Sequence, residues 1–344
     1  MVNLSGVQLR RSMKVQYVNE TGEDAGGLFR DWINALSEFF AETLFEEFGD
    51  EGMVISKEFI RSDPSVLSLY RFFGRFFGMV LFHCQTMSLT LAPPFFALLL
   101  GNKIMLEEIR ESDPANFNRI INHIDSDMDE ERWEYEYDDW ADPAVDGKSV
   151  KRFVSVSPDH KVTDAISFDC RKKWAVQYLQ YRIGRSPHIM NAIREGINEV
   201  IPFVWLELFE PNEMKRFICG ESNLDIAQWK EYTVVHAKVD QQSVGFFWRW
   251  LEEGTEQDRE KMLKFVSGRK RTPAGGFQNA FVGLNRDGKM LIEPLRGHEA
   301  EDRVDACPTS ATCSARLYLP KYSSFEKFKY FVELAMNSAG FNII

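Results

Sequence analysis

The sequence has few cysteines, and they are not arranged for a disulfide framework or for zinc. Its five cysteines form an odd set without a Cys-x-x-Cys pair: Cys84, Cys170, Cys219, Cys307 and Cys313. Disulfide-rich secreted domains carry even sets of cysteines, and structural zinc sites need closely spaced thiols and histidines. We therefore expect a reducing compartment, the cytoplasm or also the nucleus, and neither a metal nor another cofactor.

Long apolar runs and an excess of basic residues are also absent. The most apolar stretch, residues 72–84, is shorter than a bilayer crossing and contains Arg75, and no secretory signal follows the first methionine. The 41 Lys and Arg residues against 52 Asp and Glu residues give a formal net charge of −11. Because phosphates attract basic surfaces, we expect no nucleic-acid partner, and we expect no membrane partner either.

Signatures of several enzyme classes are missing. The sequence has no phosphate-cradling Gly-x-x-x-x-Gly-Lys motif, no His-Glu-x-x-His and no Gly-x-Ser-x-Gly. Its six histidines are scattered singly, and none lies beside a plausible nucleophile. A lone histidine in an apolar run, such as His83, is more often a core residue. The strongest remaining candidate for chemistry is a cysteine without a neighbouring base.

What is present is apolar material for large cores. With 344 residues, 44% of them hydrophobic and 28 of them phenylalanine, the chain is long enough for two compact lobes. Helices are predicted at residues 28–44, 167–184, 186–202, 243–253 and 256–266. Two more are predicted to begin at residues 64 and 93. The helix at 256–266 has Thr255 and Asp258 as a capping box. Gly74 and Gly78 predict a close helix contact, a strand is expected at 14–19, and a hairpin turn at 285–288.

An acidic segment with aromatic residues lies between 125 and 146. Trp133, Tyr135 and Tyr137 alternate there, which favours a strand with one buried face over a solvated loop. In the next predicted helix, Trp174, Tyr178 and Tyr181 share one face, and a core role is the simpler interpretation.

Cys313 ends the segment CPTSATC and directly precedes a predicted strand at 315–319. The residues before it are small, so a bulky acyl donor could approach the thiol, and the strand would hold its position. A final helix, capped by Ser323 with Glu326, follows. A generic cysteine is more often simply buried, so the context has to carry the catalytic interpretation.

The tail LPKYSSFEKFKYFVELAMNSAGFNII resembles the end of HECT-type ubiquitin ligase domains. There a Thr-Cys pair precedes a strand, a Leu-Pro-x-Tyr turn and a last helix. Further matches follow in the family's order over residues 14–344: DAGGLFRDW, RFFGRFFGMVLF, APPFFALLLG, WAVQYLQYRI, REGINEVIP, LFEPNEMKRFICG, DIAQWKEYT, FFWRWLEE and LKFVSGRKRTPAGGF. The ordered set is far more specific than any one motif.

The resemblance implies an α+β fold in two lobes. A larger, mostly helical N-lobe at residues 1–222 would bind a ubiquitin-conjugating enzyme. A smaller α/β C-lobe at residues 223–344 would carry the catalytic cysteine. A short hinge at Cys219–Asn223 would let one cysteine face first the donor enzyme and then the substrate.

The resemblance also assigns roles to residues. Cys313 would carry ubiquitin as a thioester, with Thr312 and Phe341 supporting transfer to a substrate lysine. Trp174 and Tyr178, with the aliphatic Ile120 and Ile124, would form the groove for the conjugating enzyme. Exchange of an acyl group between two thiols is near thermoneutral and needs no strong base, in line with the lack of a neighbouring histidine. The expected partners are therefore ubiquitin, a conjugating enzyme and a protein substrate.

The sequence departs from the family at several positions. Members often have His two residues before the cysteine and Phe-Asn after it, whereas this chain has Ala311, Ser314 and Ala315 there. It ends in Ile344 where many members end in an acidic residue. These differences bear on the efficiency of transfer and on the linkage preference.

Two other functions remain open. The altered flanks of Cys313 would also suit a non-catalytic adaptor that binds a conjugating enzyme, and binding without any covalent adduct would favour it. A cysteine hydrolase lacks an identifiable Cys-His pair, and hydrolysis without transfer would favour it. The substrates are not readable from the sequence. In this family, regions upstream of the domain usually choose them, so the chain is expected to be part of a longer protein.

Overall fold

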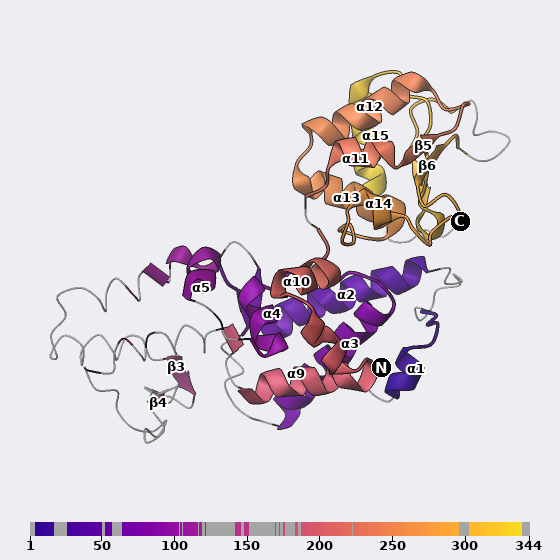
Figure 1. Ribbon diagram of the computed structural model, residues 1–344. Helices are drawn as coiled ribbons and strands as arrows, with labels where there is room; N and C mark the ends of the chain where they lie inside the picture. Colours follow the sequence, from indigo (N-terminus) through magenta and orange to yellow (C-terminus); the bar gives the residue numbers. More distant parts are fainter. Residues whose placement is uncertain are drawn as a thin grey trace. The chain divides into compact units, whose positions relative to one another are not determined.

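The computed structural model describes residues 4–16, 26–49, 52–56, 64–102, 106–115, 187–221, 223–295 and 303–338, with shorter pieces between residues 104 and 184. The chain divides into two compact units, whose elements are labelled in Figure 1. Unit 1 comprises Met1–Arg10, Glu38–Phe82 and Leu89–Lys215, and unit 2 comprises Arg11–Ser37, His83–Ser88 and Arg216–Ile344. Neither unit is one continuous segment, and the predicted lobe boundary between residues 222 and 223 stays a prediction.

Helices dominate the described part of unit 1. The long helix α2 begins in unit 2 and ends in unit 1, and two short hairpins, β1–β2 and β3–β4, are antiparallel. The described elements before residue 220 are α1 (Gly6–Leu9), α2 (Gly27–Leu44), β1 (Phe45–Glu47), β2 (Met53–Ile55), α3 (Pro64–Phe82), α4 (Pro93–Leu100), α5 (Leu106–Ser112), β3 (Asp142–Val145), β4 (Lys148–Val150), α9 (Pro187–Val200), the 3-10 helix η3 (Phe203–Leu208) and α10 (Pro211–Cys219). Like α2, α10 is shared by the units, because it belongs to unit 2 from Arg216 on.

The helices α3 and α9 pack at glycines. A Cβ on Gly74 would stand 2.1 Å from the carbonyl oxygen of Ile193, and a Cβ on Gly196 would stand 2.0 Å from that of Arg71. A Cβ on Gly78 would reach within 3.1 Å of the Val200 side chain. The close helix contact predicted from Gly74 and Gly78 is therefore confirmed, and Gly196 supplies the facing small residue.

By length and composition alone, α3 could also cross a membrane. Half of its most apolar window is buried inside the protein, however, and side chains such as Phe73, Phe76 and Phe77 are fully buried. A mostly buried core helix passes the same composition test, and the packing on α9 accounts for its apolar face.

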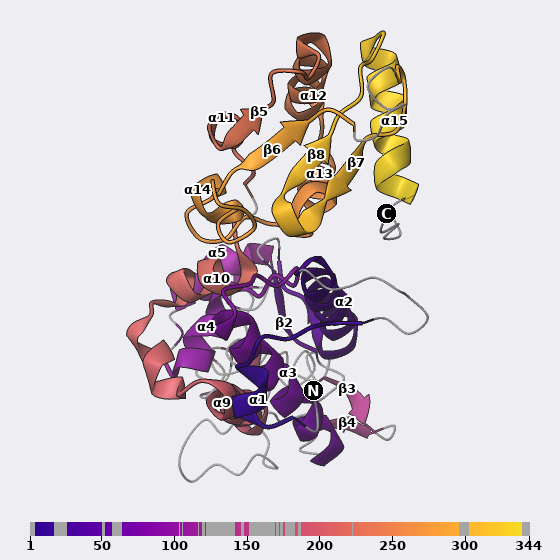
Figure 2. The same cartoon turned by 90° about the vertical axis from the view of Figure 1, so that its right-hand side faces the viewer.

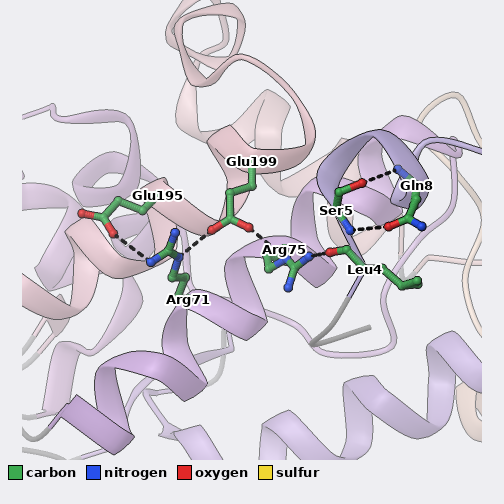
Figure 3. A network of polar contacts seen from close by, with 7 residues as sticks. All are labelled: Leu4, Ser5, Gln8, Arg71, Arg75, Glu195 and Glu199. Carbon is green, nitrogen blue, oxygen red and sulfur yellow. Dashed lines mark hydrogen bonds and ion pairs between the residues drawn. The ribbon is translucent and has the colours of Figure 1, made fainter.

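A polar network joins α1, α3 and α9 (Figure 3). The Arg71 Nε donates to Glu199 Oε1 at 2.5 Å, and the Arg75 Nε lies 3.1 Å from Glu199 Oε2. Arg75 also donates to the backbone carbonyl of Leu4, just before the capping box that Ser5 and Gln8 form at the start of α1. The buried Arg75 thus ties the N-terminal segment to the core of unit 1.

Unit 2 contains a four-stranded sheet in the order β5-β6-β8-β7. The strands β5, β6 and β8 are parallel, and β7 runs antiparallel to β8, as Figure 2 shows. The elements from residue 223 on are α11 (Ile226–Glu231), β5 (Thr233–Val235), α12 (Gln241–Glu253), α13 (Glu256–Ser267), α14 (Phe277–Ala280), β6 (Met290–Glu293), β7 (Thr309–Ala311), the 3-10 helix η4 (Thr312–Ser314), β8 (Arg316–Tyr318) and α15 (Phe325–Ser338).

Aromatic side chains fill the core of unit 2. Trp229 stacks on Phe277 with 4.6 Å between ring centroids, and Tyr322 meets Phe328 edge to face at 5.2 Å. All four side chains are almost fully buried, as is Phe247 on α12. Burial of such large rings stabilises the unit and gives the sheet a rigid support.

The predicted α+β class is confirmed, as are the helices that begin near residues 28, 64, 93, 187, 243 and 256. The capping box of α13 is present, because Thr255 accepts from the Asp258 amide and Asp258 accepts from that of Thr255. The expected strand at 315–319 corresponds to β8. The strand at 133–137 lies outside the described residues, and the helix at 167–184 does so almost entirely.

Three local predictions are wrong. Asn285–Gly288 does not form a hairpin, because the following β6 pairs in parallel with β5 and β8. Residues 14–16 are not in a strand, and the rest of that segment is outside the described part. The last helix is capped by Ser324, whose Oγ accepts from the Lys327 amide, because the Ser323 hydroxyl instead donates to Asp305.

Candidate active site

The candidate nucleophile, Cys313, lies in a four-residue turn. β7 and β8 form an antiparallel hairpin in which Ala311 pairs with Arg316, and residues 312–315, here the cysteine turn, connect them. Ala315 closes the turn in the left-handed conformation, with φ +50° and ψ +49°. For a residue with a Cβ this costs on the order of 1–3 kcal/mol and persists only where the surroundings hold it. The cysteine turn is therefore a fixed feature.

Backbone and side-chain hydrogen bonds hold the carboxyl half of the cysteine turn. The Leu291 amide donates to the Ala315 carbonyl at 2.9 Å, which continues the pairing of β6 with β8. The Asn285 Nδ2 donates to the Ser314 carbonyl at 2.9 Å and to the Lys289 carbonyl at 2.7 Å. Ala315 is fully buried, so its small side chain fits this position.

The Cys313 side chain is half-buried and its thiol is free. Thr312 and Ala311 before it and Ser314 after it are also half-buried. A thiol in the middle of a tight turn has a rigid backbone on both sides and remains partly accessible, which acyl transfer requires. This placement is compatible with the role predicted for Cys313 and Thr312, which stays a prediction.

The amino half of the cysteine turn is held by α2. The buried Arg30 donates from Nε to the Ser267 carbonyl at 2.8 Å and from Nη2 to the Thr312 carbonyl at 2.9 Å. One turn further along α2, the Asn34 Nδ2 donates to the Gly268 carbonyl at 3.0 Å. The Ser267 and Gly268 carbonyls lie at the end of α13, where a helix leaves its last carbonyls without internal partners, whereas the Thr312 carbonyl belongs to the cysteine turn.

A second buried guanidinium, that of Arg269, lies next to Arg30. Burial, together with the like charge of Arg30, lowers the pKa of Arg269 to about 10, while Cys84 acts in the opposite direction. Its Nη1 donates to the Ala280 carbonyl at 3.0 Å. The end of α13 is therefore a region of concentrated positive charge beside the cysteine turn.

The remaining predicted site residues lie outside the described part of the chain: Phe341, Trp174, Tyr178, Ile120 and Ile124. Their roles stay predictions. The sequence pattern assigns no role at the cysteine turn to Arg30 or Asn285, whose side chains contact it. For Arg30 a signal was present, since it belongs to the segment DAGGLFRDW on which the resemblance partly rests.

Comparison with known protein families identifies the chain. The family model described as HECT-domain (ubiquitin-transferase) matches residues 30–344, which is more than nine-tenths of the sequence. The match includes the cysteine turn and all of the sheet that carries it. The chain belongs to the HECT-domain family of ubiquitin transferases.

Proposed function

We propose that this chain accepts ubiquitin from a ubiquitin-conjugating enzyme onto Cys313 as a thioester and then transfers it to a lysine of a protein substrate. The observation that carries the proposal is a free, half-buried thiol in a turn held from both sides, in a chain of the HECT-domain family. The family membership supports ubiquitin transfer, and the cysteine turn supports the choice of residue.

The proposed reaction has two acyl transfers. In the first, the Cys313 thiolate attacks the thioester carbonyl of the charged conjugating enzyme. A new C–S bond forms, and the thiolate of the conjugating enzyme leaves. In the second, a deprotonated lysine amine attacks the new thioester, an amide bond forms and the Cys313 thiolate leaves. The lysine proton passes to solvent or to a base. Neither step requires an oxidant, a metal or a cofactor.

Docking of the conjugating enzyme is proposed at Trp174 and Tyr178, with Ile120 and Ile124. Aromatic residues dominate the binding energy of protein interfaces, so Trp174→Ala should weaken loading more than charge changes in the acidic segment at residues 125–146. Charges at the edge of an interface act mainly on the rate of encounter, so changes in the acidic segment should affect that rate more than the affinity. Cytoplasmic or nuclear localisation is part of the same proposal.

The test is a charging reaction with activating enzyme, conjugating enzyme, ubiquitin and ATP, resolved on non-reducing gels. The wild-type chain should form an adduct that thiol reagents remove. Cys313→Ala should form none, and Cys313→Ser should form an oxyester that resists thiol. Cys307→Ser, six residues earlier and also half-buried, is the matched control and should charge normally.

An undiminished adduct on Cys313→Ala would reject the assignment of the nucleophile. If the wild-type chain bound the conjugating enzyme but formed no adduct, the adaptor alternative would be favoured. Loss of ubiquitin to water without lysine transfer would favour the hydrolase.

A further inference from the structure

The peptide unit that precedes the candidate nucleophile is held by a side chain from a distant part of the sequence. Arg30 and Thr312 are 282 positions apart, yet the Arg30 Nη2 donates to the Thr312 carbonyl oxygen at 2.9 Å. The same guanidinium donates from Nε to the Ser267 carbonyl at 2.8 Å. One buried planar group therefore joins the last carbonyl of α13 to the cysteine turn.

The position of this bond relative to the thiol matters. The Thr312 carbonyl and the Cys313 amide belong to one planar trans peptide, so fixing the carbonyl also fixes the backbone from which the Cys313 side chain extends. Around it, α2 approaches so closely that a Cβ on Gly27 would stand 2.6 Å from Thr312 Oγ1 and 4.0 Å from the Cys313 amide nitrogen. Arg30 therefore fixes the Thr312 carbonyl, and Gly27 packs against the Thr312 side chain.

We propose that Arg30 is a positioning residue for ubiquitin transfer: by bridging the Ser267 and Thr312 carbonyls, it holds the cysteine turn in the geometry in which the Cys313 thioester is attacked by lysine. The inference rests on the proposed thioester role of Cys313. Arg30 touches backbone carbonyls and not the reacting atoms, so it acts through the turn.

Attack by lysine should depend on this bridge more than loading does. During loading, a docked conjugating enzyme presents its thioester and contributes to the alignment of the two sulfur atoms. A free lysine brings no such partner, so the orientation of the thioester comes from the chain itself. A displacement of about 1 Å at a reacting centre can cost on the order of 100-fold in rate.

The matched control lies one turn along the same helix. Asn34 donates to the Gly268 carbonyl at 3.0 Å, so it anchors the same end of α13 but makes no hydrogen bond to the cysteine turn. Arg30→Ala and Asn34→Ala therefore share the loss of an α13 anchor, and only Arg30→Ala loses the hold on Thr312.

The experiment measures two single-turnover rates, loading from a charged conjugating enzyme and discharge of the thioester to free lysine, over a range of lysine concentrations. For Arg30→Ala we expect discharge about 10- to 100-fold slower, and loading within about threefold of wild type. Asn34→Ala should discharge within about threefold of wild type. Melting temperatures show whether each variant is folded.

If Arg30→Ala does not fold, Arg30→Lys replaces it, because an ammonium keeps the charge but not the planar fork that reaches two carbonyls. It should discharge at least about fivefold more slowly than wild type. The proposal would be overturned if the folded Arg30 variant discharged its thioester to lysine at the wild-type rate. It would also be overturned if the Arg30 and Asn34 variants lost the same fraction of that rate. If the wild-type chain formed no adduct at all, the proposed function would fail and the Arg30 proposal with it. If the wild-type chain is charged and the Arg30 variant discharges normally, only the Arg30 proposal fails.

Discussion

Gly27 lies against Thr312 with no room for a side chain, since a Cβ at position 27 would stand 2.6 Å from the Thr312 hydroxyl oxygen. This contact joins the first residue of α2 to the residue before the candidate nucleophile. Because the atom in the way belongs to a half-buried side chain and not to the backbone, we expect a shift of Thr312 to relieve the conflict without unfolding.

Gly27→Ala should therefore slow discharge of the thioester to lysine several-fold while leaving the melting temperature close to that of the wild type. The same change in a Thr312→Ala background should have no further effect, since the opposing hydroxyl is gone. Discharge rates of the two single variants and the double variant form the cycle that checks this. Equal slowing by Gly27→Ala in both backgrounds would contradict the contact.

The glycines between α3 and α9 predict a large stability effect. Alanine at Gly74 or Gly196 would place a Cβ about 2 Å from a backbone carbonyl oxygen, and backbone cannot rotate away. We expect each variant to lose on the order of 3 kcal/mol or more, because overpacking forces the helices apart. Chemical denaturation followed by circular dichroism measures the loss.

Gly245 on α12 provides the control for these variants. It is exposed, and nothing lies within 4 Å of a Cβ at that position. Gly245→Ala should leave stability unchanged or raise it by up to about 1 kcal/mol, since alanine favours the helix. A comparable loss at Gly74 and Gly245 would show that helix packing is not the cause.

The network in Figure 3 distinguishes two carboxylates that face the same arginine. Glu199 contacts both Arg71 and the buried Arg75, whereas Glu195 lies 4.0 Å from Arg71 in a pair that is more than half exposed. Glu199→Ala should destabilise the chain by about 1–3 kcal/mol, because it removes a charged partner from a buried guanidinium. Glu195→Ala should change stability by less than about 0.5 kcal/mol.

Thermal unfolding at low and at high salt checks this pair of variants. The effect of Glu199→Ala should survive high salt, because buried partners are screened little. Equal effects of the two substitutions would mean that Arg75 does not depend on Glu199.

Asp305 should make the stability of unit 2 depend on pH. Hydrogen bonds from the Ser323 hydroxyl and amide lower the pKa of Asp305 in the folded chain. A carboxylate whose pKa is lowered on folding contributes stability above its unfolded pKa of about 3.9, and this contribution disappears as the pH falls through the lower native value. Wild type should therefore exceed Asp305→Asn in stability at pH 6, and the difference should vanish in strong acid.

Melting temperatures of both proteins from pH 2.5 to pH 7 test this expectation. The Asn variant keeps an acceptor for the Ser323 amide and suits the left-handed backbone at this position, where φ is +59°. A difference that stayed constant with pH would exclude the carboxylate charge as its source.

Local signals carried most of what the sequence predicted correctly. The capping box at Thr255 and Asp258 acts within one turn, so it specifies the start of α13 without knowledge of the fold. The Gly74 spacing similarly specifies a tight helix contact, although not its partner. The sequence also predicts Cys313 in a loop directly before a strand, and the structure has it in the turn before β8, while its catalytic role stays a prediction.

The errors arose where a distant group competed with a local one. The sequence predicts Ser323 as the cap of α15, but the Ser323 hydroxyl donates to Asp305, and Ser324 caps the helix instead. The Asn285–Gly288 pattern predicts a hairpin turn, whereas the Asn285 side-chain amide donates to the Ser314 carbonyl, 29 positions away. The Arg30 bridge to Thr312 follows from the fold alone, because no local pattern specifies contacts across 282 positions.

Because unit 2 is built from separate segments of the chain, truncation at the predicted lobe boundary would remove part of it. A fragment that started at the predicted boundary, residue 223, would leave Arg30 and Asn34 behind. The carbonyls of Ser267, Gly268 and Thr312 would then accept hydrogen bonds from water instead. The cysteine turn would lose the support that α2 gives to its amino half. Measurements on such a fragment would describe Cys313 without the Arg30 contact to Thr312, whereas the intact chain retains that contact.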